Sequence, residues 1–166
     1  MPLKSTMKNF NLRGSILFAF ILLFSSSCRS HRSNPDKITM RPRVFIENSA
    51  PVPIIDEYDF TNVQIGTIDN IFTENPNDRT YALWFSLDRR SAITLQKESI
   101  RRRGQTLQLI IAGQLVGFHV VQEAITNGVV AFILANDLPE ENAMMLYSEL
   151  AQSITHLQAE LREQKG

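Results

Sequence analysis

Cysteine is almost absent from this chain of 166 residues, because Cys28 is the only one. A lone thiol cannot form an intramolecular disulfide or supply the paired-cysteine spacing of a structural zinc site. Histidine is scarce too: His31, His119 and His156 lie far apart, and no HExxH motif includes them. The phosphate-binding loop, the dinucleotide-binding glycine fingerprint and the GxSxG motif are also missing. The sequence therefore indicates no metal, no cofactor and no catalytic residue. Enzymatic activity stays undecided, with a non-catalytic role favoured.

An excess of positive charge is lacking as well. The chain has 17 basic and 17 acidic residues, and the first 27 residues hold three of the basic ones and no acid. The remainder has 14 basic and 17 acidic residues, a net charge of −3, so the sequence excludes the electrostatic footprint of a nucleic-acid-binding protein. The basic triplet at 101–103 is interpreted as the last turn of a helix, where cations complement the helix dipole.

Long apolar runs are also missing. The most apolar stretch, at 16–24, has nine residues, whereas a membrane-spanning helix needs about 20. Lys4, Lys8 and Arg13 precede this stretch and three serines follow it. That order is typical of a secretory signal, so we expect residues 1–27 to be cleaved.

The small residues before Cys28 resemble the lipobox of bacterial lipoproteins, although Ser25 stands where that pattern usually has Leu or Val. The resemblance implies that Cys28 is acylated and becomes the new amino terminus. It also implies a lipid-anchored protein of the bacterial cell envelope that faces the periplasm. Arg29, where lipoproteins kept in the inner membrane commonly have Asp, favours the outer membrane. An ordinary signal peptide and a short uncleaved anchor remain as alternatives.

The rest of the chain divides into a polar segment and one domain. Residues 28–41 have almost nothing apolar to bury and are interpreted as a flexible tether. Residues 42–166 have the usual length of a single domain. Alternating apolar residues and turn signals predict strands, and two amphipathic patterns predict helices. We expect strands at 44–46, 58–71, 81–87, 106–111, 115–121 and 129–134. A first helix should run from the N-cap Asp88 to Gly104 at its C-terminal cap. A capping box of Asp137 and Glu140 should open the last helix.

Short features over about 81–157 resemble the periplasmic head subdomain of the protein-export component SecD. They are the strand end at 85–88, Ala92 and Leu95 on the following helix, Gly104, Leu107, the turn at Gly113, Ile125 with Gly128, and the final helix. The sequence departs from the family at Ala112, where an Asp is typical, and at 117–119, where a proline is typical. The resemblance implies an α+β fold, a ferredoxin-like antiparallel sheet with two helices packed on one face.

These observations favour a non-catalytic, membrane-anchored lipoprotein that acts as a protein or polypeptide interaction module. A sheet edge or the face bearing Trp84 is the expected contact surface, and no small-molecule ligand is indicated. One alternative is a small envelope enzyme using carboxylates gathered by the fold. Another is a structural spacer that assembles through Leu157 and Leu161 of the C-terminal helix. The acidic cluster Asp56, Glu57 and Asp59 is interpreted as a solvated turn rather than a calcium site.

Overall fold

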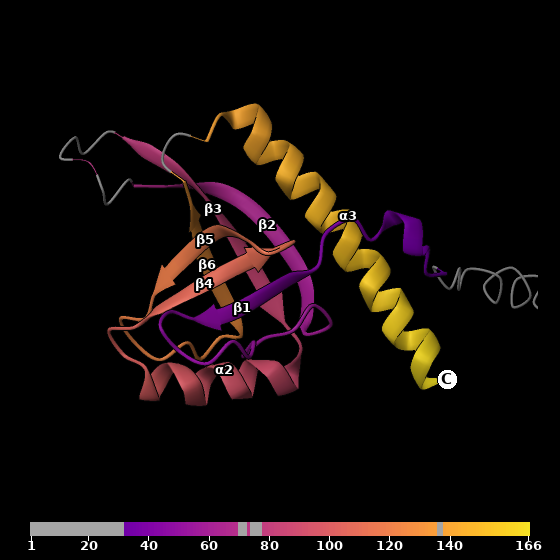
Figure 1. Ribbon diagram of the computed structural model, residues 1–166, viewed down its shortest axis with the longest axis horizontal. Helices are drawn as coiled ribbons and strands as arrows, with labels where there is room; N and C mark the ends of the chain where they lie inside the picture. The colour runs from indigo at the N-terminus through magenta and orange to yellow at the C-terminus, as the bar shows by residue number, and fades with distance from the viewer. Residues whose placement is uncertain (1–31, 70–72, 74–77, 136–137) are drawn as a thin grey trace, which may run out of the picture. The chain divides into compact units, whose positions relative to one another are not determined.

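Three strands, a helix, three more strands and a last helix follow one another in the described chain, in the order that the sequence predicts (Figure 1). The computed structural model describes residues 32–69, 73, 78–135 and 138–166, which belong to one compact unit. Its elements are the 3₁₀ turn η1 (Pro35–Lys37), β1 (Pro42–Ile46), β2 (Phe60–Asp69), β3 (Arg79–Leu87), α2 (Arg89–Arg101), β4 (Thr106–Ile111), β5 (Gln114–Val120), β6 (Val129–Leu134) and α3 (Glu140–Lys165). The expected signal peptide and the lipid attachment site Cys28 lie outside the described residues.

The six strands of the described chain form one sheet in the order β1-β4-β5-β6-β3-β2. All five neighbouring pairs are antiparallel, so the predicted α+β class with an antiparallel sheet is confirmed. The proline-rich segment after β1 covers the outer edge of that strand, where the Val44 amide donates to the Ile55 carbonyl at 3.0 Å. This contact occupies part of an edge that is otherwise open to pairing with another chain.

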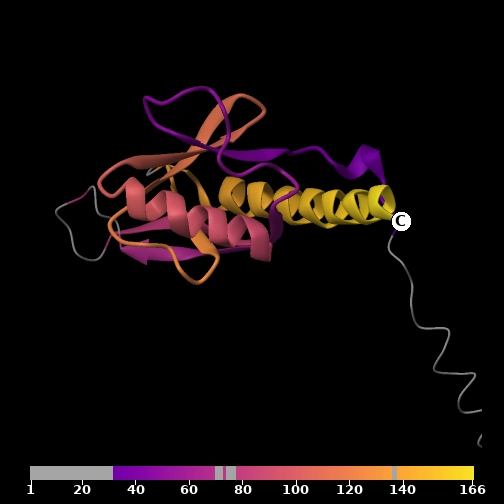
Figure 2. The same ribbon diagram turned by 90° about the horizontal axis from the view of Figure 1, so that it is seen from below.

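One face of the sheet holds the hydrophobic core and both helices. Alternate residues of the strands point to this face, and three phenylalanines meet there: the ring centroids of Phe60 and Phe85 are 4.8 Å apart, and those of Phe85 and Phe132 are 5.9 Å apart. Leu95 of α2 and Leu150 of α3 are buried in the same cluster. Seen from below, α2 and α3 lie between the β1 side and the β2 side of the sheet (Figure 2). The prediction of two helices on one face is thus confirmed.

Helix α2 has the start that the sequence predicts. Asp88 is its N-cap, and the carboxylate accepts a hydrogen bond from the Ser91 amide at 2.7 Å. The C-cap is Arg102 rather than the expected Gly104. Gly104 follows with φ +83°, and its amide donates to the Val121 carbonyl at 2.7 Å. The glycine therefore turns the chain from the helix into β4, because a left-handed backbone costs glycine little.

Helix α3 begins differently from the prediction. Its N-cap is Pro139, which makes no side-chain capping bond, so the predicted capping box that starts at Asp137 is wrong, and Asp137 itself lies outside the described residues. Proline is tolerated at this end of a helix because the N–H that it lacks would have no partner within the helix. The predicted apolar stripe does pack on the domain itself: Leu150, Ile154 and Leu157 are buried.

The compact unit starts at residue 32 rather than at residue 42. Residues 33–41, expected as part of the flexible tether, lie along α3 and hydrogen-bond to it, for example from the Met40 amide to the Ser153 hydroxyl at 3.1 Å. Residues 28–31 lie outside the described residues. The sequence gives little sign of this contact, because polar groups make its hydrogen bonds and Met40 is one of only two apolar residues in the segment.

Candidate functional site

No helix of the described chain covers the face of the sheet opposite the helices, and several apolar residues lie side by side on it. Polar residues such as Asn62 and Gln64 are exposed on it, as is usual for an uncovered face of an antiparallel sheet, but its apolar residues are half-buried. We call this surface the helix-free face. Its half-buried apolar members are Phe45, Trp84, Ile110, Phe118, Ala131 and Ile133.

Strand register brings the centre of the helix-free face together. Ile133 of β6 lies opposite Phe118 of β5 on one side and opposite Ala82 of β3 on the other. Trp84 lies beside Gly66 of β2, and a Cβ at Gly66 would meet the Trp84 ring at 3.0 Å. The glycine in this strand is therefore explained by the indole that lies over it. The predicted placement of Trp84 on the face away from the core is confirmed.

A hollow of about 480 Å³ opens in this face where β5 and β6 diverge. These strands pair only through Gly117 and Phe118 with Leu134 and Ile133. Beyond that point the loop 122–127 forms one wall of the hollow, and side chains from three strands form the rest. The strand residues are Ile68, His119, Val120, Val129, Ala131 and Ile133. The result is an open, largely apolar recess beside the edge of a strand.

His119 lies between the diverging strands. Its Nδ1 is 2.8 Å from the carbonyl oxygen of Ala131, and since that oxygen can only accept, Nδ1 carries the proton. The imidazole meets the ring of Phe132 edge-on, with centroids 6.4 Å apart. Burial lowers the pKa of His119, which the hydrogen bond to Ala131 partly offsets. A neutral imidazole thus bridges β5 and β6 where their ladder stops, as the interpretation of His119 as a strand residue anticipates.

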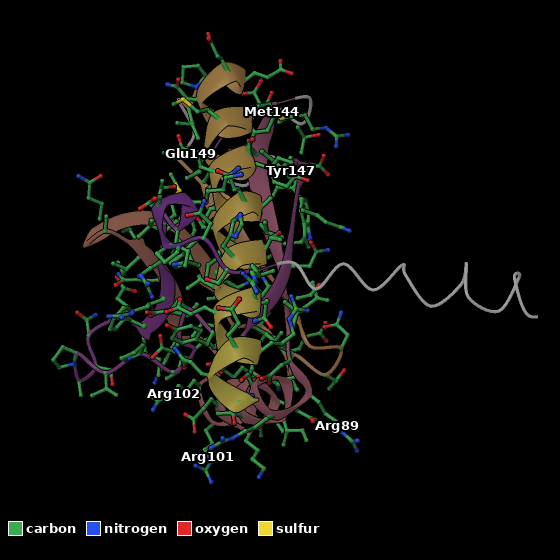
Figure 3. All side chains as sticks on the ribbon, turned by 90° about the vertical axis from the view of Figure 1, so that its right-hand side faces the viewer. Arg89, Arg101, Arg102, Met144, Tyr147 and Glu149 are labelled. Atoms are coloured by element: carbon green, nitrogen blue, oxygen red, sulfur yellow. The ribbon has the colours of Figure 1, made fainter. Side chains whose placement is uncertain are left out.

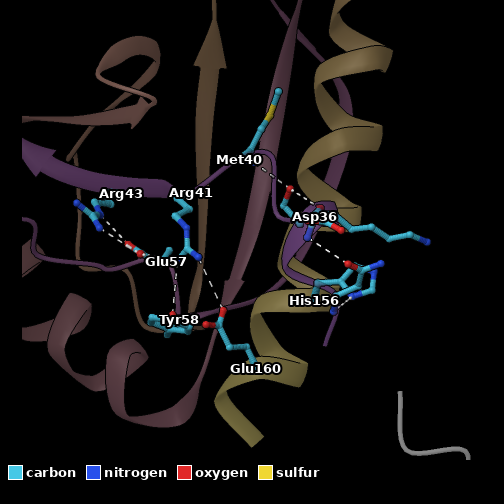
Figure 4. Close-up of polar contacts among 11 residues, drawn as sticks. Asp36, Met40, Arg41, Arg43, Glu57, Tyr58, His156 and Glu160 are labelled. Carbon is cyan, nitrogen blue, oxygen red and sulfur yellow. Dashed lines mark hydrogen bonds and ion pairs between the residues drawn. The ribbon is translucent and has the colours of Figure 1, made fainter. Parts of the chain in front are cut away.

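The acidic cluster is a structural clamp rather than a solvated turn. Glu57 is 4% exposed, and its carboxylate binds Arg43 at 2.6 Å and Arg41 at 3.1 Å (Figure 4). Burial opposes ionisation of Glu57, but hydrogen bonds from Arg43, Asp56 and Arg41 outweigh it and lower the pKa to about 2. The sequence does contain a sign of this ion-pair cluster. Arg41, just before β1, and Arg43, within it, are two positions apart, so both guanidiniums lie on one side of the chain.

The third acid of the cluster also serves the fold. Asp59 accepts hydrogen bonds from the Ser91 hydroxyl at 2.6 Å and from the Asp56 amide at 2.7 Å. A second hollow, of about 570 Å³, lies beside Asp59 and Asp88, but Asp88 is the cap of α2. Both carboxylates at this hollow therefore hold groups of the domain itself. Among the residues that the structure describes, no group of histidine, cysteine or acidic side chains is arranged to hold a metal ion.

Comparisons with known proteins bear on the fold. No protein-family model matches the chain. No curated protein matches its sequence. Solved structures of SecDF do match. One, described as a membrane component that enhances protein export, is 12% identical with a TM-score of 0.48, covering 91% of this chain and 72% of that chain. A second, SecDF in a super-membrane-facing form, is 14% identical with a TM-score of 0.46, covering 63% of this chain and 12% of that chain.

The chain resembles SecD in fold. This similarity concerns the fold alone, and the functional argument below uses only this chain's own contacts. Within the described residues, no helix has the length and apolar character needed to cross a bilayer.

Proposed function

We propose that this protein is a lipid-anchored, non-catalytic envelope protein whose helix-free face binds an extended segment of another polypeptide. The observation that carries the proposal is the apolar surface that runs across the strands of the sheet and contains the hollow beside β6. Contiguous apolar surface of this kind marks interaction sites in proteins.

The shape of the surface favours a polypeptide over a small substrate. The hollow is open to solvent along β5 and β6, and one acid, Glu123, is among its lining residues. An extended chain can lay alternate side chains into such a recess, while its main chain lies beside a strand whose ladder has ended. Aromatic residues such as Trp84 and Phe118 supply large contact area at low entropic cost.

The anchor is the second part of the proposal. Cys28, acylated after removal of residues 1–27, would hold the domain at the periplasmic side of the outer membrane. Two or more acyl chains give stable attachment, because each buried methylene contributes about 0.8 kcal/mol. Mass spectrometry of the processed amino terminus tests this directly. The Cys28→Ser variant should lose both the acyl mass and its partition into detergent.

Trp84 allows a direct binding test, because it is the only tryptophan in the chain. We expect its fluorescence to shift to shorter wavelength when a tryptophan-free, unfolded polypeptide is added, since a bound chain removes water from the indole. Ile133→Ser, which places a hydroxyl in the centre of the helix-free face, should weaken binding.

The matched control is Ile93→Ser. Ile93 is 46% exposed on α2 and does not belong to the helix-free face, so this variant should bind as the parent does. Equal loss in the two variants, or no response of Trp84 to any unfolded polypeptide, would count against the proposed site.

The two residues of the spacer hypothesis are only partly available for assembly with a second copy. Leu157 is fully buried in the domain and Leu161 is half-buried. Packing of α3 on the domain uses Leu157, so the proposal places the contact surface on the helix-free face instead.

A further inference from the structure

The main-chain groups of β6 point alternately to its two neighbours in the sheet. The Leu87 amide of β3 donates to the Gly128 carbonyl at 2.9 Å, just before β6 begins. Hydrogen-bonded and non-hydrogen-bonded positions alternate along an antiparallel ladder. Residues 130 and 132 therefore direct their N–H and C=O groups to β3, and residues 129, 131 and 133 direct theirs to β5.

Strand β5 pairs with only part of that edge. The ladder between β5 and β6 ends where Phe118 meets Ile133. Ala131 and Val129 lie beyond this point, although their main-chain groups face the same side. Four groups, an N–H and a C=O from each residue, are thus left without a partner strand.

Side chains bind two of these four groups. Nδ1 of His119 donates to the Ala131 carbonyl at 2.8 Å, and the side-chain carbonyl of Asn127 accepts from the Val129 amide at 3.0 Å. Within the part of the chain that the structure describes, the Ala131 N–H and the Val129 C=O have no hydrogen-bond partner. One donor and one acceptor remain on this stretch of β6.

Both remaining groups border the hollow of about 480 Å³, because Val129 and Ala131 are among its lining residues. The apolar side chains of Ile68 and Ile133 lie in the same lining. Main-chain groups that are shielded from water are nearly always hydrogen-bonded in folded proteins. A ligand that displaces water from the hollow must therefore offer an acceptor to the Ala131 amide and a donor to the Val129 carbonyl.

The spacing of the two groups identifies the chain that fits them. In a parallel pair of strands, one residue donates its N–H to the neighbouring strand and accepts at its C=O from the residue two positions further along that strand. The Val129 C=O and the Ala131 N–H are such a pair. In an antiparallel pair, two opposite residues exchange both bonds. The Ala131 carbonyl and the Val129 amide, which that arrangement needs, are already bound.

We propose that the hollow binds an extended polypeptide segment by its main chain, parallel to β6, with one residue of the segment donating to the Val129 carbonyl and accepting from the Ala131 amide. His119 and Asn127 select this direction, because they occupy the groups that an antiparallel chain would use. This mode of binding rests on the proposed polypeptide-binding function. Many sequences fit it, but proline at the paired residue does not, since proline has no N–H.

Hydrogen exchange of the full chain, measured amide by amide, tests the pairing. In the free protein, the Ala131 amide should exchange faster than the amides of Val130 and Phe132, which bind β3. The probe is a short, tryptophan-free peptide in which valine and threonine alternate between lysine ends. We expect it to slow exchange at Ala131 at least about tenfold. Exchange at Tyr147 should not change, because α3 packs on the other face of the sheet (Figure 3).

The matched control is the same peptide with methylated main-chain nitrogens. It keeps the side chains, but it places a methyl group where the Val129 carbonyl would accept a hydrogen bond, so it should not slow exchange at Ala131. The direction is read from a photoreactive group on the probe. At the amino end of the peptide it should crosslink to the loop 122–127, which precedes β6, and at the carboxyl end it should crosslink beside Phe118 and Ile133.

The outcomes separate this mode of binding from the binding function itself. Trp84 lies opposite Ala131 in the sheet, so its fluorescence reports binding independently. A peptide that shifts Trp84 fluorescence but leaves exchange at Ala131 unchanged would overturn the main-chain pairing and leave the helix-free face as the binding site. Slow exchange at Ala131 in the free protein would overturn the pairing too, and crosslinks in the reverse pattern would overturn the parallel direction. If neither the peptide nor a longer unfolded polypeptide affects Trp84 or Ala131, the proposed function fails, and this mode of binding with it.

Discussion

The buried ion pairs of Glu57 make a quantitative prediction about acid stability. Its pKa falls from 4.5 to about 2 in the folded protein, a difference worth about 3 kcal/mol of stability at neutral pH. Two effects reduce this figure. The side chains of Arg41 and Arg43 are 43% and 46% exposed, so water screens the attraction. The hydrogen bond with Glu57, followed by burial, also raises the pKa of Asp56, which acts in the opposite direction. We therefore expect a net contribution of about 2 kcal/mol.

The pH window follows from the sign of the shift. A carboxyl group with a depressed pKa in the folded state stabilises the fold fully above its unfolded pKa of about 4.5, and this stabilisation is lost as the pH falls towards 2. Glu57→Gln should therefore lose about 2 kcal/mol at pH 7 and should show a shallower decline of stability between pH 5 and pH 3. Urea unfolding followed by Trp84 fluorescence at several pH values measures both.

A matched control separates the buried clamp from ordinary surface charge. Asp69 pairs with Arg79 at 3.4 Å, but both side chains are well exposed, at 78% and 60%. Asp69→Asn should cost no more than about 0.5 kcal/mol, because exposed ion pairs contribute little. The reasoning would be refuted if Glu57→Gln cost no more than Asp69→Asn, or if its stability fell with acid as steeply as that of the parent.

Two further variants test other parts of the structure. Ser153→Ala should lower the free energy of unfolding by about 1 to 2 kcal/mol and speed hydrogen exchange at the Met40 amide, because it removes the buried hydroxyl that binds residues 33–41. Unchanged exchange at Met40 would show that this contact does not hold those residues on α3. Gly117→Ala should lower the free energy of unfolding by about 1 to 3 kcal/mol, since a Cβ there would lie 2.8 Å from the Ile133 carbonyl oxygen and push β5 from β6. Urea unfolding measures this change. No change in stability would mean that β5 and β6 can separate at no cost.

Local signals predicted most of the fold correctly. Asp88 caps α2 because its carboxylate meets an amide three residues on, and such a contact is visible in the sequence. The alternation in β3 correctly placed Phe85 towards the core and Trp84 away from it. The buried side of α3 was predicted correctly as well, because apolar residues that recur every three or four positions lie on the buried side of a helix.

Contacts between polar residues distant in sequence were not predictable in this way. The contact of residues 33–41 with α3 depends on Ser153 and His156, which lie beside the apolar stripe of α3 and look like ordinary surface residues in the sequence. Glu57 is buried only because β1 brings two arginines to it. The hollow results from the short pairing of β5 with β6, and a strand's own sequence does not show where its ladder to a neighbour stops.

The central claim, that the helix-free face binds extended polypeptide, is tested most directly by site-specific photo-crosslinking. A photoreactive residue replaces Ile68, in the hollow, or Ile93, on the exposed side of α2. With an unfolded, tryptophan-free polypeptide as the probe, the account predicts crosslinked product at position 68 and none at position 93. Equal product at the two positions, or product at position 93 alone, would contradict it.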